Sequence, residues 1–347
     1  MVSWRGWGHP RAGGAEAYAQ RVLAGLAARG HEVSWLCEVP TPGEVEGVRL
    51  LPGGAGLGLY PRAMAYLRRH GGRYDVVVDH VNVVGFLAPL LAPVPHLALI
   101  HQLAREVWRY EVPPPAAWLG PPAELCLLRA YRRSPFVTVS RTTLRQLRAL
   151  GWRGPGFLAY NGVEPRGPFP KAPRPTVAFL GRWGARAKRL DHALAAFARV
   201  RQALPEAELW VVGRGRPDRR PPPGVSFFPD VSDGERDALL GASWVLVATS
   251  VREGWGRMVL EAAAVGTPSL AYRVPGLAEA CRALGGELVP PDPVALGARL
   301  TACLRDPEGL VRRGREAQAR VRRFSWERTV DVWEEALQAA RVLTPGR

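Results

Sequence analysis

Two carboxylates and two glycines share a short stretch in the C-terminal half of the chain. Glu253 and Glu261 have seven residues between them, and Gly254 and Gly256 flank a tryptophan within that interval. Glycine has no Cβ, so its backbone can adopt unusual dihedral angles and let a ligand approach closely. The helix-forming run 257–265 follows directly, and the free amides and dipole of a helix start favour negative charge. We therefore expect this loop to bind an anion.

Glu261 falls inside the otherwise apolar run 258–265. Burying a carboxylate without partners costs free energy, so we expect a hydrogen-bonding partner for it. The same residues also allow a simpler interpretation, in which a surface turn precedes a helix whose glutamate points to solvent. A glycine-rich loop taken alone more often has that meaning.

Two basic residues could bind the anion from a second loop. Arg182 and Lys188 are six positions apart in a glycine-containing loop after the predicted strand 177–180. Their charge-assisted hydrogen bonds would be worth roughly 1.5 to 3 kcal/mol each. Taken singly, a basic side chain in so arginine-rich a chain is more often a solvated surface charge.

The complete pattern resembles a known family. The two glutamates, the Gly-aromatic-Gly insert and the closing Gly266-Thr267-Pro268 before the apolar strand 269–272 resemble the signature of family 4 retaining glycosyltransferases of group 1 type. This resemblance implies the GT-B fold, in which two doubly wound, Rossmann-like α/β domains with parallel sheets face each other across a cleft. The resemblance is strongest over residues 179–212 and 251–276 and weakest over residues 40–72.

The resemblance also implies roles for these residues. The substrate would be a nucleotide-sugar, UDP- or GDP-linked, whose departing diphosphate needs charge stabilisation. Glu261 would accept hydrogen bonds from ribose hydroxyls, and Glu253 would contact the donor sugar near its anomeric end. The residues placed at the diphosphate are Arg182, Lys188, Gly254, Trp255 and Gly256.

The first half supplies the remaining candidates. Gly13 and Gly14 lie between a short N-terminal strand and the predicted helix 15–29, which resembles the start of the family's first domain and predicts an acceptor or phosphate loop. His101 follows the predicted strand 96–100. A lone histidine is more often structural, but ligands bind at the carboxyl ends of parallel strands. In the family a histidine in the corresponding region approaches the donor sugar, so His101 and Glu253 are the catalytic candidates.

The chain departs from the family motif at two neighbouring residues. It also lacks a metal-binding motif that is typical of other glycosyltransferase families. Arg257 and Met258 replace a small or aliphatic residue and a proline, and Arg257 could be a third cation at the phosphates or could reach solvent. The sequence has no Asp-x-Asp, the arrangement by which many other glycosyltransferases hold a divalent ion on a diphosphate. We therefore expect no metal and no cofactor.

The domain boundaries follow from composition and from repeated strand-helix steps. Residues 1–163 form the predicted N-terminal, acceptor-side domain, and the proline-rich residues 164–175 are typical of a stiff linker. Residues 176–323 form the predicted nucleotide-sugar domain. Residues 324–347 form a C-terminal helix with an apolar side, which in related proteins packs back on the first domain. The proline-rich segment 112–122 could be a mobile acceptor-side loop or a surface connector.

Composition and charge narrow the possible partners and the cellular location. The 347 residues are 47% apolar and carry a net charge of +16, almost all from scattered arginines without a nucleic-acid-binding motif, so we expect no nucleic acid partner. Four distant cysteines indicate neither a metal site nor a disulfide scaffold. The longest apolar run, 83–100, is interrupted by prolines and is not a membrane span. We expect a cytoplasmic protein, with peripheral contact to the inner, anionic face of a membrane as a hypothesis.

These observations, together with the resemblance, predict a metal-independent hexosyltransferase that moves a sugar from a nucleotide-sugar to a hydroxyl of a glycolipid, polysaccharide or small molecule. Retention of the anomeric configuration is implied by the resemblance alone. Two alternatives stay open. One is a nucleotide-sugar epimerase of similar two-domain architecture, which product analysis without acceptor would separate. The other is a non-catalytic basic protein that binds nucleic acid or anionic membrane, which steep salt-dependent binding without nucleotide binding would favour.

Overall fold

The chain folds into two compact units, and the computed structural model describes residues 1–39, 41–215 and 220–343. The first unit contains Met1–Arg105, Trp118–Gly162 and the chain from Trp326 onward. The second contains Glu106–Ala117 and Val163–Ser325. Residue 40 of the predicted first domain, residues 216–219 of the predicted second domain and residues 344–347 of the predicted C-terminal helix lie outside the described residues.

The first unit is built on an eight-stranded sheet with the order β3-β4-β2-β1-β5-β6-β7-β8. Every pairing is parallel except that of β3 with β4. Its strands are β1 (Val2–Arg5), β2 (Val33–Glu38), β3 (Gly43–Val45), β4 (Val48–Pro52), β5 (Val77–His80), β6 (His96–Leu99), β7 (Phe136–Thr138) and β8 (Gly156–Leu158). The carboxyl ends of these parallel strands lie at one edge, where ligands bind in such sheets.

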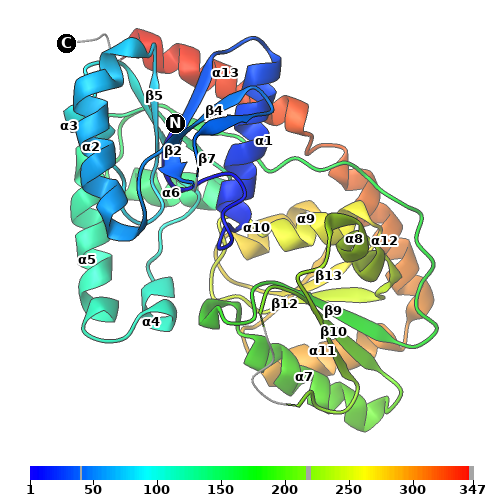
Figure 1. Cartoon of the computed structure of the whole chain (residues 1–347). Coiled ribbons are helices and arrows are strands. Elements are labelled where there is room, and N and C mark those ends of the chain that lie inside the picture. Colours follow the sequence, from blue (N-terminus) through cyan, green and yellow to red (C-terminus); the bar gives the residue numbers. More distant parts are fainter. Residues whose placement is uncertain (40, 216–219, 344–347) are drawn as a thin grey trace. The chain divides into compact units, whose positions relative to one another are not determined.

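Helices cover both faces of this sheet, with α1 beside α13 on one face and α2 beside α3 on the other (Figure 1). The helices are α1 (Gly14–Ala28), α2 (Leu59–His70), α3 (Ala88–Leu91), α5 (Ala116–Leu128, in this unit from Trp118), α6 (Arg141–Ala149) and α13 (Trp326–Leu343), with short 3-10 helices η1 (Gly56–Gly58), η2 (Gly71–Arg73) and η3 (Arg129–Tyr131). The C-terminal helix is thus part of the first unit, where the indole Nε1 of Trp333 donates to the Tyr18 hydroxyl at 2.8 Å.

The second unit is built on a six-stranded, all-parallel sheet with the order β11-β10-β9-β12-β13-β14. Its strands are β9 (Thr176–Leu180), β10 (Glu208–Gly213), β11 (Val225–Pro229), β12 (Val245–Ala248), β13 (Ser269–Tyr272) and β14 (Glu287–Val289). The central strands β12 and β13 are buried at every position, as expected where helices cover both faces.

In this unit α7 and α11 lie on one face of the sheet, and α8, α9 and α12 lie on the other (Figure 1). The helices are α4 (Val107–Glu111), α7 (Leu190–Ala203), α8 (Asp233–Ala242), α9 (Arg257–Ala264), α10 (Leu277–Ala283), α11 (Pro293–Leu304) and α12 (Pro307–Val321), with the 3-10 helix η4 (Arg186–Lys188). The predicted class of two doubly wound parallel sheets is confirmed.

Two segments differ from what the sequence suggested. The predicted loop or connector 112–122 instead enters helix α5 at Ala116, and Pro121 and Pro122 lie inside that helix. Each proline removes one backbone donor, but the run that follows them is rich in helix-forming alanine and leucine. In addition, residues 106–117, which the sequence placed with the first domain, group with the second unit. Residues 159–175 contain neither helix nor strand, which suits the predicted linker composition.

Within the described ranges, no helix is both long enough and apolar enough to cross a lipid bilayer.

Candidate active site

The glycine loop of the second unit leads directly into helix α9. Gly256 is its N-cap residue and has φ +99°, a left-handed conformation that side chains with a Cβ rarely adopt. A Cβ at this position would also approach Leu277 Cδ1 to 3.2 Å and Ala280 Cβ to 3.3 Å. Glycine is therefore required for the backbone to turn here and present its amides at the helix start.

Backbone contacts hold the Lys188 loop against this glycine loop. The Thr249 hydroxyl donates to the carbonyl oxygens of Lys188 and Arg189, both at 2.9 Å. The amide of Val251 donates to the carbonyl of Ala187, also at 2.9 Å. Because these bonds join two loops at the carboxyl ends of β9 and β12, the Lys188 side chain has a fixed origin beside the glycine loop.

Lys188 and Glu253 form an ion pair. The ammonium Nζ lies 2.5 Å from Glu253 Oε1, and the Ser250 hydroxyl donates to the same oxygen at 2.6 Å. Both side chains are mostly buried, with exposed fractions of 23% for Lys188 and 14% for Glu253. Glu253 therefore already has a cationic partner in the ligand-free protein, and Lys188 keeps further donors for an anion.

Arg182 and Trp255 differ from Lys188 in their exposure and in their contacts. Arg182 is exposed, and among the described residues its guanidinium forms no ion pair. The Trp255 side chain is only 2% exposed and packs against Phe324 with ring centroids 4.8 Å apart. Trp255 can therefore offer a diphosphate its backbone amide, as Gly254 can, while its indole belongs to the core.

Glu261 has the partner that the sequence predicted, and that partner is Arg257. Arg257 Nε donates to Glu261 Oε1 at 2.8 Å across one helical turn, and Arg236 Nη1 lies 3.7 Å from the same oxygen. The sequence left open whether Arg257 reaches phosphate or solvent, and in the structure it pairs with Glu261 instead. Both cations approach Oε1, so Oε2 remains to accept hydrogen bonds.

In the first unit, Gly13 caps helix α1 and Gly14 begins it. The amide of Gly13 donates to Glu16 Oε2 at 2.7 Å, and Arg5 Nη1 lies 4.0 Å from Glu16 Oε1. Glu16 is buried. An incoming phosphate at this helix start would therefore have to compete with a carboxylate of the protein itself for the Gly13 amide.

His101 lies just beyond the carboxyl end of β6. Its ring is 5.0 Å from the ring of His80 and 5.1 Å from that of Tyr18, measured between centroids. Its Nε2 atom is buried and has no hydrogen-bond partner among the described residues. Burial, and secondarily the neighbouring His80, holds the pKa of His101 well below its usual value, so the imidazole is neutral at neutral pH.

Two family models match this chain. Residues 12–166 match the family model described as Glycosyltransferase Family 4, and residues 174–306 match the one described as Glycosyl transferases group 1. The chain belongs to this glycosyltransferase family.

Individual relatives match with different coverage. A D-inositol 3-phosphate glycosyltransferase from Salinispora tropica is 38% identical over 34% of this chain and 26% of its own length. The glycogen synthase of Mycobacterium tuberculosis (strain CDC 1551 / Oshkosh) is 26% identical over 98% of this chain and 94% of its own. The chain thus spans about a quarter of the length of the first two curated relatives that it matches.

Solved structures share the fold. Sucrose-phosphate synthase from Thermosynechococcus elongatus superposes with a TM-score of 0.79 at 22% identity, covering 99% of this chain and 98% of its own. Anabaena HepE, in complex with UDP-glucose, has a TM-score of 0.71 at 16% identity, covering 97% and 99%. The GT-B fold inferred from the sequence is confirmed.

Sequence reasoning missed two acidic residues that contact the Lys188 and glycine loops. In the segment 106–117, the Glu106 carboxylate accepts from Arg252 Nε at 2.6 Å and from Nη2 at 3.2 Å. Glu111 Oε1 accepts from the amide of Ala187 at 2.9 Å. The Arg252 side chain is only 3% exposed. Contacts over 146 and 76 residues of sequence leave no local pattern that could have predicted them.

His80 was missed as well. It ends strand β5, is 2% exposed, and neither of its ring nitrogens has a hydrogen-bond partner among the described residues. Burial lowers the pKa of His80 to about 4. Its position as the last residue of a buried strand was the available signal. A histidine pair, rather than His101 alone, therefore lies at the carboxyl edge of the first sheet.

Within the described part of the chain, no cluster of histidine, cysteine and carboxylate side chains could hold a metal ion.

Proposed function

We propose that this glycosyltransferase takes its sugar from a nucleoside diphosphate sugar and transfers it to an acceptor hydroxyl, with retention at the anomeric carbon and without a metal ion. The observation that carries the proposal is the Lys188 ammonium, fixed beside a glycine-lined helix start that needs φ +99° at Gly256. A cation beside the backbone amides of a helix start suits a pyrophosphate. The HepE structure is a complex with UDP-glucose, which supports a UDP-linked sugar as the donor.

Each residue has a proposed task. Lys188, Arg182 and the amides of residues 254–256 oppose the charge that develops on the departing diphosphate. Glu261, whose Oε2 remains to accept, takes ribose hydroxyls. Glu253, oriented by Lys188 and Ser250, contacts the sugar. These cations take the part that a divalent ion has in other transferases.

His101 remains the candidate of the first unit. A neutral imidazole with a buried, unpartnered Nε2 among the described residues can exchange a hydrogen bond with a sugar hydroxyl. The Gly13-Gly14 loop remains the proposed acceptor-side element. We further propose a cytoplasmic location, with an acceptor that is a glycolipid, a polysaccharide or a small molecule.

The test is ligand binding followed by turnover. Thermal shift with UDP, GDP and UMP should show stabilisation by one diphosphate and much less by the monophosphate, because binding raises stability by RT ln(1 + [L]/Kd). Release of the nucleoside diphosphate from the matching sugar donor should require an acceptor and persist in EDTA. Failure of both diphosphates at millimolar concentration would refute the donor site. A changed sugar without an acceptor would indicate an epimerase.

A further inference from the structure

Residues 106–117, called here the α4 segment, contain helix α4 and contact both loops of the proposed donor site. The segment follows strand β6 in the chain, but it groups with the second unit. It carries two carboxylates, Glu106 directly before α4 and Glu111 at the last residue of that helix. The tasks proposed above for the donor site use neither of them.

Glu106 holds the glycine loop. Its carboxylate accepts from Arg252 Nε at 2.6 Å and from Nη2 at 3.2 Å. The Arg252 side chain is 3% exposed, whereas that of Glu106 is 53% exposed. A fully exposed ion pair contributes little, but a buried guanidinium needs its charge balanced, so this two-point contact orients Arg252. Because Arg252 directly precedes Glu253, Glu106 acts next to the carboxylate that is proposed to contact the sugar.

Glu111 holds the Lys188 loop. Its Oε1 accepts from the amide of Ala187 at 2.9 Å, and Ala187 directly precedes Lys188. Ala187 is buried, and a buried amide needs an acceptor. The carbonyl of Ala187 accepts from the amide of Val251, also at 2.9 Å. The backbone of Ala187 is therefore bonded to the α4 segment on one side and to the glycine loop on the other.

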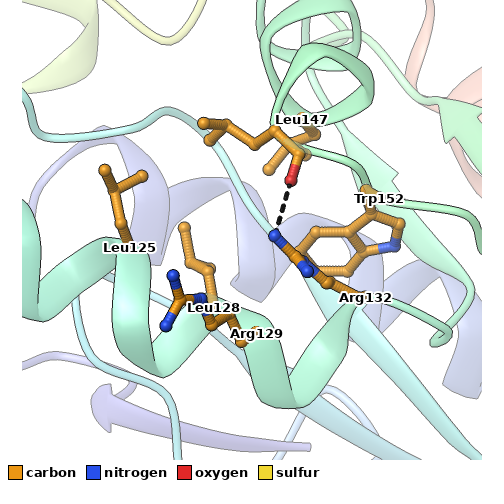
Figure 2. A pocket seen from close by; sticks show the side chains of 7 residues that line it. Leu125, Leu128, Arg129, Arg132, Leu147 and Trp152 are labelled. Atoms are coloured by element: carbon orange, nitrogen blue, oxygen red, sulfur yellow. Dashed lines mark hydrogen bonds between the residues drawn. The ribbon is translucent and has the colours of Figure 1, made fainter.

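The chain on either side of the α4 segment is fixed in the first unit. The Glu124 carboxylate accepts from the two backbone amides just before the segment, at 2.7 and 3.3 Å. Leu103 before the segment and Leu128 after it belong to one buried apolar cluster. Figure 2 shows Leu128 beside a cavity of about 130 Å³, with Leu147 and Trp152 of the same cluster on the other side. A loop with fixed ends has fewer conformations, so its carboxylates lose less entropy when they bond the donor loops.

We propose that the two carboxylates of the α4 segment are positioning residues for the transfer reaction. They hold the Lys188–Glu253 ion pair in the arrangement that meets the donor diphosphate. Each carboxylate bonds the residue that precedes one member of the pair, so each sets the backbone from which that side chain extends. A displacement of about 1 Å is enough to spoil a preorganised site, because charge-assisted bonds to phosphate are short. This inference rests on the proposed donor site.

The alternative is that the α4 segment blocks the donor site. A carboxylate at the Ala187 amide would then exclude a phosphate, and its removal would tighten diphosphate binding. The contacts favour positioning, because Glu111 bonds Ala187 and leaves the Lys188 ammonium with further donors for an anion. The charge of Glu106 is likewise directed at Arg252.

The first experiment is calorimetric titration of the full chain with UDP or GDP, whichever stabilises it, and with the corresponding nucleoside. Glu106→Ala and Glu111→Ala should each weaken diphosphate binding about fivefold or more and change nucleoside affinity little. Glu111→Gln should recover most of the affinity, because its amide oxygen still accepts from Ala187. The matched control is Glu208→Ala, which loses an ion pair with Arg174 at the start of β10 and should leave both affinities unchanged.

The outcomes separate positioning from its alternatives. An equal loss for diphosphate and nucleoside would overturn the proposal, because it would indicate general loosening of the unit. Tighter diphosphate binding would also overturn it and would make the α4 segment a block. Combining Glu111→Ala with Lys188→Met should give a loss smaller than the sum of the single losses, since Glu111 acts through Lys188. A fully additive loss would contradict that role.

Hydrogen exchange of the ligand-free protein tells a failure of this proposal from a failure of the donor site. Residues 182–189 and 250–256 should exchange faster in Glu106→Ala and Glu111→Ala, and at the unchanged rate in Glu208→Ala. If these rates stay the same while the diphosphate binds, the α4 segment does not hold the loops and the proposal is wrong. If the loops exchange faster but the unchanged chain binds neither UDP nor GDP, the donor site is wrong, and the positioning role falls with it.

Discussion

Removing the charge of Glu253 should strengthen the binding of the nucleoside diphosphate product while it slows transfer. Glu253 Oε1 lies 2.5 Å from Lys188 Nζ in the ligand-free protein. A diphosphate held by Lys188 therefore places its own negative charge a few ångströms from the Glu253 carboxylate. The two anions repel each other, and Glu253→Gln removes the repulsion while keeping the shape of the side chain.

The magnitude follows from the geometry. Two unit charges about 5 to 6 Å apart at an effective dielectric constant of about 20 repel by roughly 3 kcal/mol, and partial exposure reduces this. We expect Glu253→Gln to tighten diphosphate binding by about 1 to 2 kcal/mol, or about 5- to 30-fold. Lys188→Met should weaken it by about 1.5 to 3 kcal/mol through loss of a charge-assisted bond.

Calorimetric titration of the two variants and the double variant with the diphosphate measures these values, with the nucleoside as ligand for a control. The nucleoside lacks phosphates, so its affinity should change little in any variant. The two single changes should also be non-additive, because the residues contact each other. Weaker diphosphate binding in Glu253→Gln would refute this account, since it would mean that Glu253 organises the phosphate site instead of opposing the anion.

Three further outcomes are expected. Gly256→Ala should destabilise the protein by about 1 to 3 kcal/mol in chemical denaturation, because of φ +99° and the close Leu277 side chain, whereas Gly184→Ala, in open space, should not. Because burial lowers the pKa of His80 to about 4, the unfolded chain binds more protons between about pH 6.5 and 4. His80 alone should therefore lower stability by about 3 kcal/mol across that window on acidification, in addition to the loss from His101, and His80→Gln should remove the His80 share. Trp333→Phe should lower stability by about 2 kcal/mol through loss of its hydrogen bond to Tyr18, seen as a lower Tm.

The strands of the second unit were predictable because they are short apolar runs between glycine-containing loops. The strand expected at 269–272 is β13, and the one expected at 177–180 lies within β9. Strands covered on both faces have continuous apolar sequences, so their positions depend on burial alone. The role of the loop that follows β12 was predicted from the whole pattern of glutamates and glycines, because a glycine-rich loop taken alone is more often a surface turn.

Proline made the first half harder to predict. Helix α2 begins at Leu59 and contains Pro61 in its first turn, where the missing amide costs nothing. In α5, Pro121 and Pro122 fall later in the helix, and a local rule predicts a break there. Packing decides such cases: Leu128 at the end of α5 is buried in the cluster that contains Tyr131, and this burial offsets the lost bonds.

Side-chain partners were the least predictable part of the site. The sequence indicated that Glu261 needs a partner, and Arg257 is one helical turn away, which a rule for neighbouring residues can find. Lys188 and Glu253 are 65 residues apart, and only the order of β9 and β12 in the sheet brings their loops together. Local sequence carries no information on that order.

The two glutamates share a further property that bears on how a ligand binds. In Glu253 the described contacts of the carboxylate, from Lys188 and Ser250, all fall on Oε1, and in Glu261 those from Arg257 and Arg236 do the same. Each carboxylate thus has its charge balanced and its orientation fixed before any ligand arrives. A sugar or ribose hydroxyl can then donate to Oε2 without displacing a cation, so the protein has no buried charge to rearrange when it binds.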